Sequence, residues 1–291
     1  MSPRLILQAK LDSGYLDDAI NALLVTWGVT ADSPSVGPTG PSRIQVFSNI
    51  RRRVHKVLER IFRALPSNMI GSCVNVWSSN ASGISDDAIF DCIDSLTPSA
   101  QRVIELVSEN VNGKQSRNSK ADYQPDPALM AFLEAYTSRL EAPIAVQVWP
   151  TLFSFAREIL GSAGAPFAKA QLYPVLCCLT ILAKTVSTTS ALEDRRLRRD
   201  LQDIYAKCLD VVVANASRIS NGSMLDRNAM REKQEQPNGH STEAPLIQIY
   251  RFIAESVLPN LRAFLLDSER VNTACTSISA SIVVPAFRQQ K

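Results

Sequence analysis

The sequence predicts an all-α protein, built as a HEAT/armadillo-like helical-repeat array with one disordered insert. Apolar residues recur with the 3.6-residue period of an amphipathic helix, and no segment of any length alternates with the period of two typical of strands. The predicted helices are short and are joined by short loops. Such helices favour stacking, because no single pair can bury its apolar face alone.

Five helices are predicted in the N-terminal segment, residues 1–111. They cover 14–28, 44–65, 67–78, a stretch that begins at Ser85 and one that begins at Thr97-Pro98. Gly28 is expected to end the first helix. Ser85 is expected to cap the fourth, with Asp86 and Asp87 in the first turn, where carboxylates favour the positive end of the helix dipole.

Residues 112–126 are polar and lack apolar periodicity, so we expect a flexible linker there. The C-terminal segment, residues 127–291, is predicted to be helical-repeat again. Its helices are expected at 127–141, 144–160, 169–187, 191–219, 246–266 and 268–284. An insert at 220–245 contains Asn-Gly, Pro-Asn-Gly and many charges, and this composition predicts disorder.

The most repeat-like stretch is residues 257–271, VLPNLRAFLLDSERV. A proline in an apolar first helix, Asp267 at the turn and Val271 just inside the second helix resemble a HEAT repeat. In such a repeat the proline bends the first helix and the aspartate caps the second. An ordinary helical hairpin is the alternative interpretation.

The composition favours a binding protein over an enzyme. A net charge of +3 is too mild to indicate nucleic acid, and the six cysteines form no CxxC pair, so we expect buried thiols. The two histidines have no ligand or catalytic partner at a suitable spacing, and GxSxG, GxGxxG and GxxxxGK[ST] are absent. We therefore expect no catalytic residues, metal or cofactor. The longest apolar run, Leu172 to Leu182, is far shorter than the roughly 20 residues of a membrane span, so no transmembrane segment is predicted.

Two basic clusters remain as candidate contact sites. In the helix at 44–65, five cations project within about 100° of one another, opposite the apolar stripe. They are Arg52, Arg53, Lys56, Arg60 and Arg63, and only Glu59 interrupts them. This face is suited to anionic phospholipid headgroups or an acidic partner, and a solvated polar face is the alternative.

The second cluster, Arg195-Arg196-Leu197-Arg198-Arg199, is followed by acidic residues at helical spacing. Asp200 lies four residues after Arg196, and Asp203 lies four residues after Arg199. We expect these pairs to neutralise the cluster internally and to support the helix.

Three blocks of the sequence together resemble the C-terminal part of the Dopey family of eukaryotic trafficking proteins. They are LPSNMIGSCVNVW (65–77) with AIFDCIDSLTPSAQRVIELV (88–107), RRDLQDIYAKCLDV (198–211), and VLPNLRAFLLDSERV (257–271) running on to VPAF (284–287). None of these blocks is a catalytic signature. Because members of the family are very large, the chain is expected to be a fragment or a shortened gene product.

The resemblance implies a non-enzymatic scaffold in vesicle-mediated protein transport between endosomes and the Golgi. It further implies a cytoplasmic protein that lies peripherally on Golgi and endosomal membranes and acts with a large armadillo-like trafficking scaffold. Two alternatives stay open: a HEAT-type adaptor of another pathway, and a lipid-binding helical domain with a large apolar cavity.

Overall fold

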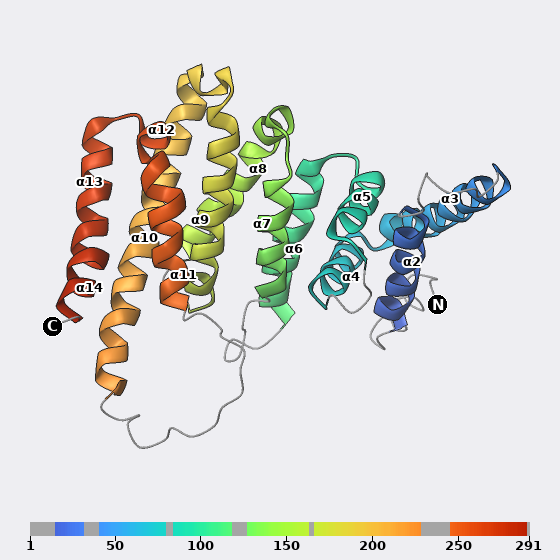
Figure 1. Cartoon of the computed structure of the whole chain (residues 1–291), viewed down its shortest axis with the longest axis horizontal. Helices are drawn as coiled ribbons and strands as arrows, with labels where there is room; N and C mark the ends of the chain where they lie inside the picture. The colour runs from blue at the N-terminus through green and yellow to red at the C-terminus, as the bar shows by residue number, and fades with distance from the viewer. Residues whose placement is uncertain are drawn as a thin grey trace. The chain divides into compact units, whose positions relative to one another are not determined.

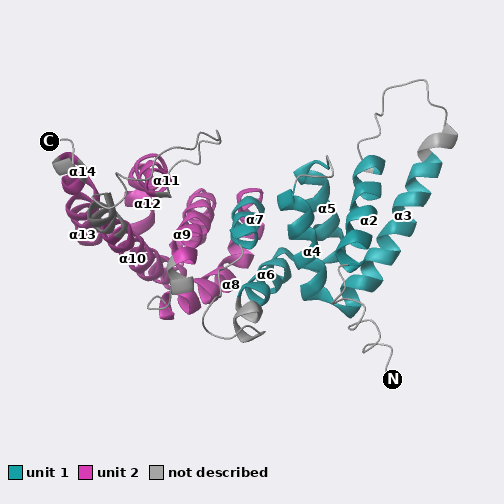
Figure 2. Cartoon of the chain, turned by 90° about the horizontal axis from the view of Figure 1, so that it is seen from below, with its two compact units in different colours: residues 1–136 teal, residues 137–291 magenta. Residues whose placement is uncertain are grey.

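The computed structural model confirms the predicted all-α, helical-repeat fold. It describes residues 15–31, 41–79, 84–117, 127–162, 166–227 and 245–289. Every regular element in these ranges is a helix or a helical turn, and the helices pack mainly against others nearby in the sequence (Figure 1). The chain forms two compact units, unit 1 with residues 1–136 and unit 2 with residues 137–291 (Figure 2).

Unit 1 is built around α2, which packs against α3, α4 and α5, while α4 also packs against α6. Its helices are α2 (Tyr15–Ala31), α3 (Pro41–Ala64), α4 (Pro66–Ser79), α5 (Asp86–Leu96), α6 (Ala100–Arg117) and most of α7 (Pro127–Ser138). Ser85 caps α5 as predicted, because its hydroxyl oxygen accepts the backbone N–H of Ala88 at 3.3 Å.

Four aromatic side chains form a cluster in the core of unit 1. The ring of Phe132 lies 5.6 Å from Trp77, 5.4 Å from Phe90 and 6.1 Å from Tyr136. Phe132 and Tyr136 are almost completely buried, and the Tyr136 hydroxyl donates to an Asp94 carboxylate oxygen at 2.7 Å. The cluster therefore joins α4, α5 and α7 through one set of ring contacts.

The prediction that Gly28 ends the first helix is wrong, since α2 continues to Ala31. The glycine serves a close approach instead. A Cβ atom at Gly28 would lie 2.9 Å from Cγ2 of Ile84, which is too close for ordinary contact. The absent side chain lets the segment before α5 pack directly on α2.

Unit 2 is organised around the long helix α10, which packs against α8, α9, α11, α12 and α13. Its α-helices are α8 (Ala142–Gly161), α9 (Pro166–Ser187), α10 (Arg195–Arg227), α11 (Pro245–Phe252), α12 (Leu261–Leu265), α13 (Ser268–Ile278) and α14 (Val284–Gln289). Short 3-10 turns cover Ser190–Glu193 and Leu258–Asn260, and π-helical turns cover Ile253–Val257 and Ser279–Val283. At the core, the Tyr205 ring packs on Phe264 at 5.2 Å, and its hydroxyl lies 3.1 Å from that of Thr180.

The repeat-like stretch 257–271 forms a helical hairpin with the predicted cap. Pro259 lies in the 3-10 turn that precedes α12, and Leu266 takes a left-handed conformation (φ 53°) where α12 ends. A carboxylate oxygen of Asp267 accepts the backbone N–H of Glu269 at 3.0 Å and so caps α13.

Two stretches predicted to be irregular begin as helix. Helix α6 continues to Arg117, into the range 112–126 expected to be a linker, and residues 118–126 lie outside the described residues. Helix α10 likewise continues to Arg227, into the insert expected at 220–245, of which residues 228–244 are not described. The first residues of both ranges are therefore helical.

One stretch among the described helices, Ala170–Ser187 of α9, is long and apolar enough to cross a membrane by length and composition alone. Its mean hydropathy is 1.3, and 61% of it is buried within the structure. Leu176, Leu179 and Leu182 are completely buried in unit 2. The core helix of a globular protein passes the same test, so this stretch is weak evidence for a membrane span.

Five of the six cysteines are buried, as predicted, and Cys275 on α13 is half-buried. Burial raises the pKa of the Cys73 thiol well above its usual range, and it raises the pKa of Cys92 and of Cys208 to about 12. These three side chains are therefore neutral thiols at physiological pH.

Candidate functional site

The described residues contain no group of three or more His, Cys, Asp or Glu side chains that could hold a metal ion. His55 lies on the inner side of α3, where its Nε2 is 3.2 Å from the Ser95 carbonyl oxygen and its ring is 6.0 Å from that of Trp27. The Arg51 guanidinium lies over the Trp27 ring at 4.1 Å. Arg51 and His55 thus fasten α3 to α2 and α5. His240 lies outside the described residues.

The five predicted contact residues Arg52, Arg53, Lys56, Arg60 and Arg63 are all exposed on α3. The opposite side of this helix buries Val54, Leu58 and Phe62 against the rest of unit 1. At about 100° per residue, the five cations occupy a band about 100° wide that faces away from this buried side. The structure therefore places them together on one solvent-facing side of α3, which lies at the edge of unit 1 (Figure 2).

This band of cations is only weakly neutralised. Arg63 donates to a Glu59 carboxylate oxygen at 2.6 Å, and Arg52 donates to the neutral amide oxygen of Asn49 at 3.1 Å. Within the described part of the chain, Arg53, Lys56 and Arg60 have no ion-pair partner. Positive charge consequently accumulates over the middle of α3.

Beside the cations lies an apolar part of this surface that was not predicted from the sequence. Val46, Ile50 and Val57 are 54%, 36% and 44% exposed, although the helical period groups Ile50 and Val57 with the apolar residues of this helix. The three side chains share an arc of about 40° directly beside Arg53. We call these three residues and the five cations the α3 surface.

A signal for the exposed apolar arc exists in the sequence. The apolar residues of α3 spread over about 160° of the helix, whereas a core-facing stripe needs about 100°. An excess of this size predicts that part of the apolar arc lies outside the core.

The second basic group does not pair as predicted. Asp200 accepts from Arg157 of α8 at 3.1 Å, and Asp203 accepts from Arg270 of α13 at 2.6 Å. The expected i,i+4 pairs within α10 are therefore replaced by pairs to neighbouring helices. Local pairs stabilise a helix by only about 0.2–0.5 kcal/mol, so arginines on packed neighbours compete readily for these carboxylates. We call Arg195, Arg196, Arg198 and Arg199 the arginine cluster.

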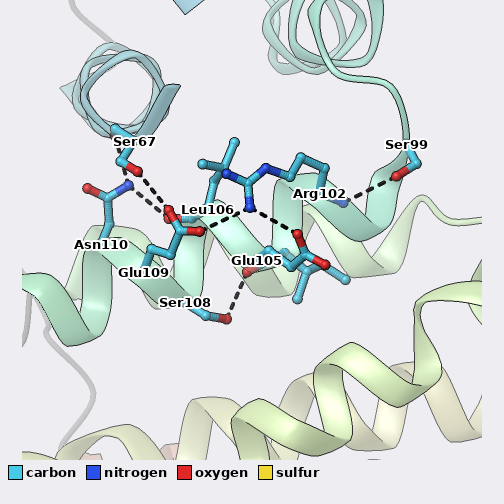
Figure 3. Close-up of polar contacts among 9 residues, drawn as sticks. Ser67, Ser99, Arg102, Glu105, Leu106, Ser108, Glu109 and Asn110 are labelled. Atoms are coloured by element: carbon cyan, nitrogen blue, oxygen red, sulfur yellow. Dashed lines mark hydrogen bonds and ion pairs between the residues drawn. The ribbon is translucent and has the colours of Figure 1, made fainter. Parts of the chain in front are cut away.

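A polar network elsewhere in unit 1 shows how a cation is neutralised in this chain (Figure 3). Arg102 donates to Glu105 and to Glu109 at 3.0 Å each, and the hydrogen bond to Glu105 raises the pKa of the guanidinium. Glu109 also accepts from the Ser67 hydroxyl at 2.8 Å, and the Asn110 amide donates to the Ser67 carbonyl oxygen at 2.8 Å. This network ties α6 to the start of α4, so its charges have a structural explanation that the α3 surface lacks.

Comparisons with known proteins place the chain in a family. The family model described as DOP1 C-terminal matches residues 132–291. Protein dop1 of Emericella nidulans is 22% identical over 287 residues, which cover 93% of this chain and 15% of that protein. The chain thus spans about 15% of the length of this curated relative. No solved structure matches.

Proposed function

The chain belongs to the DOP1, or Dopey, family, and from this premise we propose that it is a non-enzymatic scaffold or adaptor in vesicle-mediated transport between endosomes and the Golgi. We place it in the cytoplasm, peripherally on Golgi and endosomal membranes, with a large armadillo-like trafficking scaffold as its partner. Stacked helices support this role, because helical arrays offer extended surfaces for binding.

The observation that carries the membrane part of this proposal is the composition of the α3 surface. Five exposed cations lie beside three exposed apolar side chains on the same outer side of one helix. Cations of this kind attract anionic headgroups, and adjoining apolar side chains can enter the boundary between headgroups and acyl chains. An acidic protein would need the cations alone, so the added apolar arc favours a lipid surface.

Co-purification tests the proposed scaffold role. We expect affinity purification of the tagged chain from cells to recover a large armadillo-like trafficking protein, because helical arrays act through the partners that bind their extended surfaces. The bound proteins would be identified by mass spectrometry, with the tag alone as control. Recovery of nuclear-transport or phosphatase subunits instead would contradict the trafficking role and support a HEAT-type adaptor of another pathway.

Charge reversal tests the membrane contact. The triple variant Arg53→Glu, Lys56→Glu, Arg60→Glu is expected to lose binding to phosphatidylserine-containing vesicles in co-sedimentation. Each cation near such a surface contributes about 1 kcal/mol, so the loss of three weakens binding by at least about 100-fold. The three side chains have no ion-pair partner among the described residues, so the circular dichroism spectrum and thermal midpoint should stay unchanged.

The arginine cluster supplies a matched control for this variant. Arg195→Glu, Arg196→Glu, Arg199→Glu changes the net charge of the chain by the same amount at another place. It should leave most vesicle binding intact. Equal losses in both triple variants would show that overall charge, and not the α3 surface, determines the binding.

A variant of the apolar arc distinguishes a membrane from an acidic protein as the partner that the α3 surface binds. Changing Val46, Ile50 and Val57 to serine keeps every charge, and full burial of such a side chain contributes about 1.5–3 kcal/mol. If the three side chains enter the bilayer even partly, the variant should bind vesicles at least about tenfold more weakly than the unaltered chain. Unchanged vesicle binding would show that the contact is purely electrostatic.

A further inference from the structure

No carboxylate forms an ion pair with the arginine cluster within the described residues. Arg195, Arg196 and Arg199 are exposed and Arg198 is half-buried at the start of α10. None of the four guanidinium groups has an ion-pair or hydrogen-bond partner in the part of the chain that the structure describes.

The neighbouring carboxylates are already engaged. Asp194 accepts the backbone N–H of Arg196 at 2.8 Å and caps α10, while Asp200 and Asp203 bind Arg157 and Arg270. Among the described residues of this stretch, Glu193 alone is an acidic side chain without a hydrogen bond or an ion pair, and it is exposed. Three of the four arginines are therefore exposed and the fourth is half-buried, and none of them has an ion-pair partner among the described residues.

The position of the cluster is unfavourable for the helix itself. The positive end of the α10 dipole lies at Arg195, where cations are disfavoured. Arg195 and Arg199 are also four residues apart, a spacing at which like charges repel on a helix. Charged side chains that oppose the helix dipole and repel one another, without a stabilising contact in return, are typical of a functional site.

We infer that the arginine cluster binds a carboxylate-rich segment of a partner protein. All four cations are arginines, whose planar guanidinium groups can grip a carboxylate with two parallel hydrogen bonds. The helix dipole adds to the attraction for an anion. No side chain from Ser187 to Asp203 is an exposed large apolar residue, and Glu193 borders the cluster, so this surface lacks the features of the α3 surface that suit a lipid bilayer.

The arginine cluster lies on a different helix and in a different unit from the α3 surface, so this contact is independent of the membrane contact and of the trafficking role. A scaffold with both surfaces would bind a membrane through α3 and an acidic protein segment through α10. Each activity can be removed without the other.

The test uses the full chain and a fluorescein-labelled glutamate-rich peptide, with its glutamine counterpart as control, in fluorescence anisotropy. The unaltered chain and the α3 charge-reversal variant should bind the glutamate peptide. The variant Arg195→Glu, Arg196→Glu, Arg199→Glu should bind it at least about 100-fold more weakly, because several charge-assisted hydrogen bonds become repulsive contacts. This variant should fold, since Arg195 and Arg196 lie in the first turn of α10, where glutamates are favoured, and Arg199 is exposed.

The conservative variant Arg195→Lys, Arg196→Lys, Arg199→Lys gives a second measurement that does not depend on charge reversal. It keeps the charge but removes the planar guanidinium groups that can make two parallel hydrogen bonds, so we expect roughly a five- to tenfold loss of peptide binding. The inference would be overturned if the unaltered chain did not bind the glutamate peptide, or if the α3 charge-reversal variant lost as much peptide binding as Arg195→Glu, Arg196→Glu, Arg199→Glu. It would also be overturned if the latter variant lost vesicle binding but kept its binding of the peptide.

Discussion

Replacement of Phe132 by alanine is expected to lower the free energy of unfolding by about 3–5 kcal/mol. Phe132 is completely buried and contacts the rings of Trp77, Phe90 and Tyr136. Alanine would leave a cavity among rings that α4, α5 and α7 hold in place, so the site can collapse only partly. Urea unfolding followed by circular dichroism would measure the loss, and the fluorescence of Trp77 would report the change beside it.

Phe287→Ala provides the matched control for this prediction. Phe287 on α14 is 68% exposed, so its removal should change the free energy of unfolding by no more than about 0.5 kcal/mol. A loss at Phe132 as small as that at Phe287 would contradict the role of the aromatic cluster in the core of unit 1.

Replacement of Gln171 by methionine is expected to raise the free energy of unfolding by about 1–3 kcal/mol. Gln171 on α9 is 1% exposed, and neither its amide oxygen nor its amide nitrogen has a hydrogen-bond partner among the residues that the structure describes. Methionine has a similar length and no polar atom that must be desolvated, so the change removes a cost while it keeps the packing. Thermal and urea unfolding would measure the gain.

Gln202→Met tests the same substitution where the amide is paired. The Gln202 side chain on α10 donates to the carbonyl oxygen of Leu265 at the end of α12. Its replacement should cost about 1 kcal/mol, opposite in sign to the effect at Gln171. Destabilisation by Gln171→Met would show that the buried amide is satisfied, for instance by a water molecule, and would refute the expectation.

Features that depend on a few neighbouring residues were predicted correctly from the sequence. Ser85 caps α5 and Asp267 caps α13, because each cap involves a backbone N–H only two or three residues away. The exposed cations of α3 were placed on one side by the helical period alone, which requires no knowledge of the rest of the chain.

Features that depend on distant residues could not be predicted. Gly28 is explained only by Ile84, which packs against it from another segment. The ion pairs of Asp200 and Asp203 join residues 43 and 67 positions apart, and local spacing contains no information about them. The width of the apolar arc of α3 indicates that part of it lies outside the core, but the exposure of Val57 in particular depends on which side of α3 the other helices cover.

The distribution of the buried thiols makes the two units separately observable. Cys73 and Cys92 lie in unit 1, whereas Cys177, Cys178 and Cys208 lie in unit 2. A buried thiol reacts with an alkylating reagent only when the structure around it opens, so the alkylation rate at each cysteine measures the free energy of that local opening. The chain thus contains its own probes for whether its halves unfold together or one after the other.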